Sequence, residues 1–167
     1  FLIPLWNVYS FFVTYANIDE FDPRAEIPLI SERTELDRWI LSELNSLTRE
    51  VTRALESFEP ENVTREVEQF TEYLSNWYIR RSRRRFWKSG LLSDSSEDSN
   101  HDKLSAYSTL YETLVTLTKL LAPVVPFITE SIYQNLVTSQ ALGKESVHLE
   151  EYPVTDRNIV ERELSER

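Results

Sequence analysis

The chain has 167 residues, of which 41% are hydrophobic and 28% are charged, enough to form one domain with a core of its own. With 28 acidic and 18 basic side chains the formal charge is −10, which argues against a general nucleic-acid binder. The absence of cysteine and the presence of only two histidines, His101 and His148, exclude disulfides and a thiol nucleophile and predict no metal site. Only two glycines occur, so neither kind of glycine-rich phosphate-binding loop is present.

Residues 1–18 are so apolar that a membrane span and a signal peptide must be considered first. Neither fits, because the stretch contains Pro4 and is followed at once by acidic residues, with no basic flank or cleavage site. The polar residues of this segment fall in one helical stripe: Asn7, Ser10, Thr14 and Asn17. We therefore expect a helix that is buried on most sides by protein. Since the chain opens in this apolar run and contains no methionine, we also expect a piece of a longer protein.

Apolar residues recur every three or four positions through most of the remaining chain, which predicts further helices. Ser31 or Thr34 is expected to cap the first of them, and Gly90 is the first residue to interrupt the second. The expected helices span about 35–58, 60–89, 104–121 and 127–137. Strand patterns are otherwise absent, so the predicted fold class is all-α, an antiparallel bundle of four to five helices over residues 1–153.

Three segments are predicted to lie outside these helices. Residues 89–102 are polar and acidic, which is typical of a mobile loop. Residues 146–149 alternate between polar and apolar, a stretch too short to form a sheet alone. Residues 154–167 form a charged tail, which we interpret as the start of a linker or of a following helix.

Basic charge is concentrated near the end of the second long helix, where nine residues contain six cations and no acid. The six are Arg80, Arg81, Arg83, Arg84, Arg85 and Lys88. The rest of the chain has 12 basic and 28 acidic residues, a charge of −16. A charge distribution this uneven produces an electrostatic field that is expected to orient a charged partner.

The helical register adds aromatic residues to this cluster. At about 100° per residue, the apolar stripe that begins at Val63 runs on to Trp77, Arg81, Arg84, Arg85 and Lys88. The bundle is therefore expected to open there, because unpaired guanidinium groups cannot be buried in a dry core. Arginine suits forked phosphate contacts and aromatic faces stack on unpaired bases, so the pattern favours an RNA loop over a DNA groove.

Two other interpretations remain open for the arginine cluster. The arginines could form internal salt bridges with some of the 28 acids, or bind a protein with an acidic surface. The polar stripe of residues 1–18 is better explained by hydrogen bonds between helices than by ligand contact. For His101 and His148 we expect plain solvation.

Four blocks of the chain, in order, resemble the anticodon-binding domain of isoleucyl-tRNA synthetases. They are FLIPLWNVYSFFVTYAN at 1–17, LSNWYIRRSRRRFW at 74–87, LLAPVVPFITE at 120–130 and ESVHLEEYP at 145–153. The last three blocks are similar to those of the valyl, leucyl and methionyl relatives within class Ia. The first block is the one that indicates isoleucine.

This resemblance implies a helical bundle that follows a catalytic domain and binds the anticodon stem-loop of an isoleucine tRNA. The parent enzyme would be cytoplasmic and would attach isoleucine to its tRNA with ATP and magnesium. The two ATP-site signatures of the family, His-Ile-Gly-His and Lys-Met-Ser-Lys-Ser, are missing, so this piece is expected to be inactive alone and to need no cofactor. Its expected partners are the tRNA and the catalytic domain of its own chain, with no membrane and no DNA. The alternatives are a valyl-, leucyl- or methionyl-type domain, or a helical protein-interaction bundle.

The resemblance also suggests individual tRNA contacts. The methionyl pattern places a base-contacting aromatic in the stretch Arg85, Phe86 and Trp87, and raises interest in Asn7 and Tyr15 of the first helix. Our hypothesis assigns base stacking to Trp77 or Trp87. It assigns the phosphates to a basic set: Arg80, Arg81, Arg84, Arg85 and Lys88.

Overall fold

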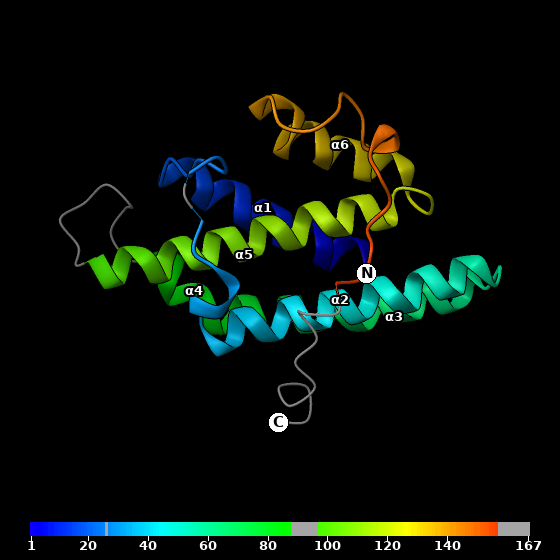
Figure 1. The fold of residues 1–167 in the computed structure, drawn as a ribbon, viewed down its shortest axis with the longest axis horizontal. Helices are drawn as coiled ribbons and strands as arrows, with labels where there is room; N and C mark the ends of the chain where they lie inside the picture. The colour runs from blue at the N-terminus through cyan, green and yellow to red at the C-terminus, as the bar shows by residue number, and fades with distance from the viewer. Residues whose placement is uncertain (26, 88–96, 157–167) are drawn as a thin grey trace.

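The computed structural model describes residues 1–25, 27–87 and 97–156 of the chain (Figure 1). Its α-helices are α1 (Leu2–Ile18), α2 (Glu35–Glu56), α3 (Pro60–Glu72), α4 (Arg80–Trp87), α5 (Glu97–Leu121) and α6 (Pro126–Leu136). A π-helix, η2 (Tyr73–Ile79), joins α3 to α4, and short 3-10 turns occur at η1 (Ile30–Glu32), η3 (Thr138–Gln140) and η4 (Val147–Leu149). No strand occurs in these ranges, so the predicted all-α class is confirmed.

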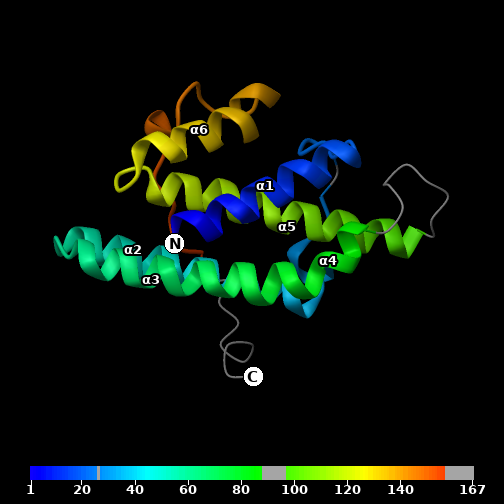
Figure 2. The same cartoon turned by 180° about the vertical axis from the view of Figure 1, so that it is seen from behind.

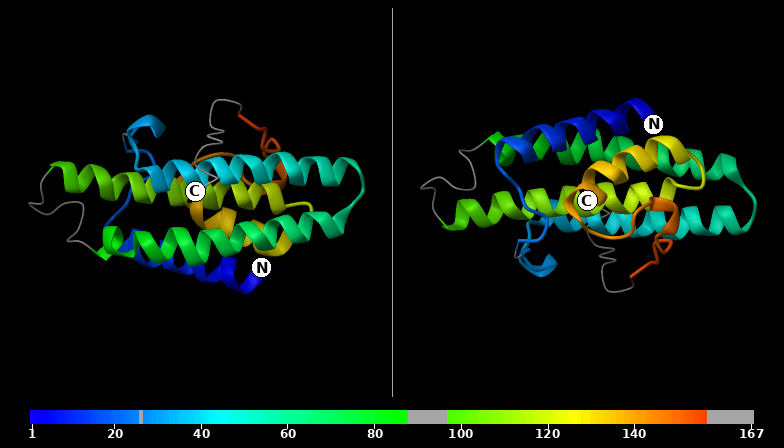
Figure 3. Two further views of the ribbon diagram at one scale, coloured as in Figure 1. Left: turned by 90° about the horizontal axis from the view of Figure 1, so that it is seen from below. Right: turned by 90° about the horizontal axis from the view of Figure 1, so that it is seen from above.

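When α3, η2 and α4 are taken as one path, successive helices run in opposite directions along the long axis of the molecule (Figures 1 and 2). α3, η2 and α4 form one continuous helical path beside α2, and α5 runs the length of the bundle (Figures 1 and 2). Views from above and below show α1 against the α3–α4 path (Figure 3). α6 lies on the opposite side of α5 from α2 and α3 (Figures 1 and 2). The result is an antiparallel bundle with α5 in contact with α1, α2, α4 and α6.

The helix ends follow from local sequence. Thr34 caps α2, because its Oγ1 accepts a hydrogen bond from the Asp37 amide at 3.3 Å, while Asp37 accepts from the Thr34 amide in return. Pro60 and Pro126 occupy the first position of their helices, where a missing N–H costs nothing. α2 ends at Glu56, and Phe58 takes a left-handed conformation in the following turn with its ring exposed, so the predicted apolar stripe stops before Phe58.

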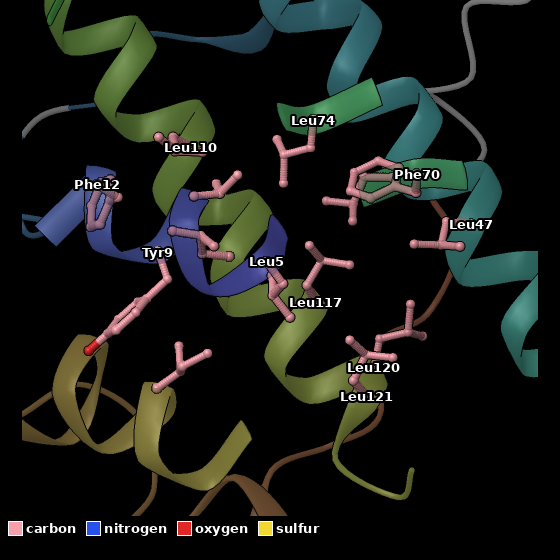
Figure 4. Packing of buried hydrophobic residues seen from close by; sticks show 14 of the residues in the cluster. Leu5, Tyr9, Phe12, Leu47, Phe70, Leu74, Leu110, Leu117, Leu120 and Leu121 are labelled. Atoms are coloured by element: carbon pink, nitrogen blue, oxygen red, sulfur yellow. The ribbon is translucent and has the colours of Figure 1, made fainter. Parts of the chain in front are cut away.

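The core is one continuous apolar cluster along the bundle axis. Side chains from α1, α2, α3, η2 and α5 meet in it (Figure 4). Those labelled in the figure are Leu5, Tyr9, Phe12, Leu47, Phe70, Leu74, Leu110, Leu117, Leu120 and Leu121. Burial of this apolar surface is the main favourable term that holds the helices together.

The first helix is less enclosed than its sequence predicts. Only four of its side chains are buried: Leu5, Val8, Tyr9 and Phe12. Leu2, Ile3 and Trp6 are exposed, because α5 and the α3–η2 path cover a single side of α1. Among the described residues the polar stripe makes no hydrogen bond to another helix, and Thr14 bonds back to the Ser10 carbonyl at 2.7 Å within α1. The expectation of a helix buried on most sides is therefore wrong, and the part of the chain that the structure describes provides no interhelical hydrogen bond for the stripe.

The helix after the predicted loop begins earlier than expected. α5 starts at Glu97, so residues 97–102 are helical, and 88–96 lie outside the described residues. At the other end, 147–149 form a 3-10 turn, and most of the charged tail, 157–167, lies outside the described residues as well. Within the described ranges, no helix is both long and apolar enough to cross a membrane.

Candidate nucleic-acid interface

The π-helix η2 decides which side of α4 faces the core. In a regular α-helix about 100° per residue would bring Arg81 and Arg85 to the same side as Val63. The π-helix η2 has wider turns and accommodates about one additional residue. As a result, Ser82 and Phe86 face the core in place of Arg81 and Arg85. Both of these are buried, so the predicted opening of the bundle is wrong and the core stays closed along α4.

The same rotation turns four arginines outward. Arg80, Arg81, Arg83 and Arg84 are all exposed, and none of them forms an ion pair with any described residue. Trp77 and Trp87 are also exposed, by 51% and 57%. Four of these exposed side chains follow Trp77 by three, four, seven and ten residues, which places them on the same side of the helix as Trp77. We call this set the α4 face: Trp77, Arg80, Arg81, Arg84 and Trp87.

Two aromatic contacts order the α4 face. The Arg81 guanidinium lies over the Trp77 ring, 4.7 Å from its centroid, as in a cation–π pair. The Trp87 indole Nε1 donates a hydrogen bond to the Tyr15 hydroxyl of α1 at 2.7 Å. Tyr15 is itself half-buried against Phe11, with ring centroids 4.8 Å apart. The structure therefore brings together two predicted contact residues, Tyr15 and Trp87, that are far apart in sequence.

Two of the predicted contact residues point inward instead. The Arg85 guanidinium donates to both carboxylate oxygens of Asp37, at 2.8 and 2.7 Å, and its Nε lies 2.9 Å from Asp102 Oδ1. Phe86 is 1% exposed and packs edge-on against Phe11 and Tyr107, with centroids 5.1 and 4.8 Å away. For Arg85 the internal salt-bridge interpretation is correct, and neither side chain is available to RNA.

The remaining candidates differ in placement. Asn7 is exposed on α1 and forms no hydrogen bond with any residue in the described ranges. Lys88 lies outside the described residues. The α4 face and Tyr15 are thus the part of the predicted site that the structure assembles in one place.

The Asp37–Arg85 pair is electrostatically tight. Burial by itself raises the pKa of the Asp37 carboxyl, but hydrogen bonds from Arg85, Tyr78 and Thr34 and the charge of Arg85 outweigh it, so the pKa lies below its ordinary value. Burial opposes the charged form of Arg85 too, and the nearby Asp37 and Asp102 raise its pKa above the ordinary value. Both groups are therefore charged in the folded protein.

Asp37 and Asp102 are partners of the cluster that the sequence did not lead us to expect. A signal was present, since the apolar or small residues Leu74, Tyr78, Ser82 and Phe86 recur at intervals of four. Because an α-helix has about 3.6 residues per turn, residues spaced strictly four apart drift around its surface. They stay on one side only where the helix has wider turns. That signal would have placed Arg85 beside the core.

Chemically, the α4 face offers forked phosphate donors next to exposed indoles. Guanidinium groups bind phosphate oxygens in pairs of hydrogen bonds, and indole faces stack on unpaired bases. Phosphate contacts fix the position of a bound strand, whereas stacking and base contacts select among strands. The surface therefore has the groups needed to hold a single-stranded RNA loop.

Comparison with known proteins gives a consistent family. The model of a family described as the anticodon-binding domain of tRNA ligase matches residues 37–167. The chain is 54% identical over 165 residues to an isoleucine–tRNA ligase of Dehalococcoides mccartyi strain CBDB1. That alignment covers 98% of this chain and 15% of the relative. It is 45% identical over 167 residues to the isoleucine–tRNA ligase of Clostridium acetobutylicum, covering 99% of this chain and 15% of the relative. The chain thus spans about 15% of the length of the relatives it matches.

Proposed function

Since the chain belongs to the family of anticodon-binding domains of tRNA ligases, we propose that it binds the anticodon stem-loop of an isoleucine tRNA. The observation that carries this proposal is the α4 face, where exposed arginines without ion-pair partners among the described residues flank two exposed indoles. A surface serving only as a protein contact would not need this combination of forked cations and stacking rings.

Within this proposal the residues divide by chemistry. Arg80, Arg81 and Arg84 hold phosphates of the stem-loop, and Lys88 joins them as the next cation along the chain after the inward Arg85. Trp77 and Trp87 stack on unpaired bases. Tyr15 acts through its hydrogen bond to Trp87, which fixes the orientation of that indole, and Asn7 extends the contact along α1.

The whole enzyme is proposed to be an isoleucine–tRNA ligase of the cytoplasm. Its catalytic domain would use ATP and magnesium to activate isoleucine, and this domain would contribute tRNA binding without taking part in that chemistry. The catalytic domain of the same chain is the second proposed partner. The exposed Leu2, Ile3 and Trp6 at the start of α1 support a contact with another protein surface at that end.

The test is tRNA binding across a salt series, measured by fluorescence anisotropy. Removing one phosphate contact reduces the slope of log K against log salt by about 0.7 to 0.9. The double variant Arg80→Gln with Arg84→Gln is expected to lower that slope by about 1.5 and to weaken binding at least tenfold at about 0.15 M salt.

A control variant removes the same charge elsewhere. Arg49 and Arg53 are exposed on α2, where both lie beside Glu50. Arg49→Gln with Arg53→Gln is expected to leave both slope and affinity nearly unchanged. Equal reductions in the two double variants would mean that net charge alone drives binding, and would contradict a site on α4.

Comparison among tRNAs separates the remaining interpretations. A preference for isoleucine tRNA over valine, leucine and methionine tRNAs supports the proposed specificity. Binding that ignores tRNA identity but keeps a steep salt slope would restrict the domain to holding the stem. Absence of tRNA binding, together with salt-insensitive binding of a protein, would favour the protein-interaction bundle instead.

A further inference from the structure

Several hydrogen-bond donors surround the carboxylate of Asp37, at the end of the bundle that carries α4. It sits in the first turn of α2 and is fully buried. Oδ1 accepts hydrogen bonds from the Tyr78 hydroxyl at 2.7 Å and from Arg85 at 2.8 Å. Oδ2 accepts from Arg85 and from the Thr34 hydroxyl, both at 2.7 Å. Five donors, including the Thr34 amide, thus converge on one carboxylate.

Two of these donors fix the helix that bears the α4 face. Tyr78 belongs to η2 and Arg85 to α4, and they lie seven residues, about two turns, apart on the inward side. A helix held to one point at two successive places cannot rotate about its axis or slide along it without breaking a buried bond. Arg85 also donates to the Asp102 carbonyl at 2.8 Å, which ties the same helix to the first turns of α5.

We propose that Asp37 is a positioning residue for tRNA binding, whose carboxylate holds η2 and α4 at the rotation in which the α4 face meets the RNA. This inference rests on the proposed function above. Asp37 itself touches no RNA, because it lies in the interior and acts only through Tyr78 and Arg85.

The direction of the expected effect separates this role from simple electrostatics. Asp37→Asn removes a negative charge from an acidic protein, and by charge alone this would strengthen binding of a polyanion. It would also release Arg85 from its carboxylate, which again would favour phosphate binding if that arginine were a direct contact. Positioning predicts the opposite, a weaker complex, because the arginines and indoles would no longer meet the strand together.

The chain contains a closely matched control for loss of a buried ion pair. Arg33, with 2% of its side chain exposed, pairs with both carboxylate oxygens of Glu112 on α5 at 3.0 and 2.8 Å. Glu112→Gln removes one acid and neutralises the carboxylate that pairs with an arginine, as Asp37→Asn does, although Arg85 keeps Asp102 as a second acidic partner. Among the described residues, the hydrogen bonds of Arg33 and Glu112 do not end on η2 or α4, and their nearest link to η2 is Thr109, which Arg33 contacts and which is also a side-chain partner of Tyr78.

The experiment compares isoleucine-tRNA affinity and its salt slope for the wild type, Asp37→Asn and Glu112→Gln, below the melting temperature of each. Helical content is followed by circular dichroism in the same samples. We expect Asp37→Asn to weaken binding about tenfold with a shallower salt slope, and Glu112→Gln to stay within about twofold of the wild type. Tyr78→Phe removes one donor and leaves the ion pair, so it should fold fully and weaken binding about two- to threefold.

The results that overturn the inference differ from those that overturn the proposed function. If the wild type binds no tRNA, the proposed function fails. If the wild type binds through the α4 face but folded Asp37→Asn binds equally or more tightly, the positioning role is refuted. Equal weakening by Glu112→Gln would show a general effect of destabilisation and would also refute it. Should Asp37→Asn fail to fold, unchanged affinity in Tyr78→Phe refutes the role.

Discussion

Phe86 and Trp87 are neighbours in the chain that the structure assigns to opposite sides of α4. Phe86 fills the space between α1 and α5, whereas Trp87 lies on the surface with a single hydrogen bond to Tyr15. Replacing each by alanine should therefore affect different properties. Phe86→Ala is expected to lower stability, and Trp87→Ala is expected to lower tRNA affinity.

The magnitudes follow from burial. Removing a fully buried phenylalanine ring costs about 3–5 kcal/mol, and the two edge-on ring contacts of Phe86 are part of that cost. At about 2–4 °C per kcal/mol for a domain of this size, the melting temperature should fall by about 10 °C. Trp87→Ala removes one exposed hydrogen bond, about 1 kcal/mol or less, but a stacked base is worth about 1–3 kcal/mol, which corresponds to about tenfold weaker affinity.

Thermal unfolding by circular dichroism and tRNA binding by anisotropy read out the two effects separately. Phe127→Ala is the matched control, because Phe127 is 91% exposed on α6, a helix that lies apart from α4 (Figure 1), so this change should affect neither quantity. If Trp87→Ala lowers the melting temperature as far as Phe86→Ala does, the orientation of α4 in the structure is wrong. Unchanged tRNA affinity in Trp87→Ala would refute the stacking role.

Two further predictions concern the segment that follows α6. Hydrogen bonds from Tyr133, the Lys144 amide and Lys119 lower the pKa of Glu150 to about 2, so its contribution to stability is present above about pH 5 and is lost as the pH falls from about 4.5 towards 2. Thermal unfolding across that range should show Glu150→Gln losing less stability than the wild type, by about 2 kcal/mol, and parallel decreases would contradict this linkage. Gly143 has a φ of +63°, and a Cβ there would lie 2.5 Å from the Tyr133 hydroxyl and 2.7 Å from Glu150 Oε1, so Gly143→Ala should lower stability by about 1–3 kcal/mol. An unchanged melting temperature in that variant would show that the turn adopts another conformation.

The sequence predicts the helices well because their signals are local. Apolar spacing locates the long helices, and the Thr34 cap fixes the start of α2 through contacts within four residues. The exposure of α1 was not predictable in the same way, because it depends on which neighbours cover the helix. An apolar run shows that a surface prefers burial, not whether the partner that buries it lies in the same stretch of chain.

The proposed binding surface was predicted in composition but not in orientation. The cluster of arginines and indoles was evident from the sequence, and Trp87 and Tyr15 were both expected to contribute. The inward turn of Arg85 was missed because a helical wheel assumes a constant angle per residue, and one stretch of π-helix breaks that assumption. The acidic partner, Asp37, lies 48 positions away, a distance over which periodicity carries no information.

The wide turns between Tyr73 and Ile79 also bear on how related chains should be aligned with this one. A single extra residue in a helix rotates everything after it by about 100°. A relative with one residue fewer here, folded as regular α-helix, would still direct the counterparts of Ser82 and Phe86 to its core. The gap between two such chains therefore belongs within 73–79. A gap placed beyond Trp87 would match the buried Phe86 with the outward counterpart of Trp87, and would transfer the proposed base contact to a side chain enclosed in the core.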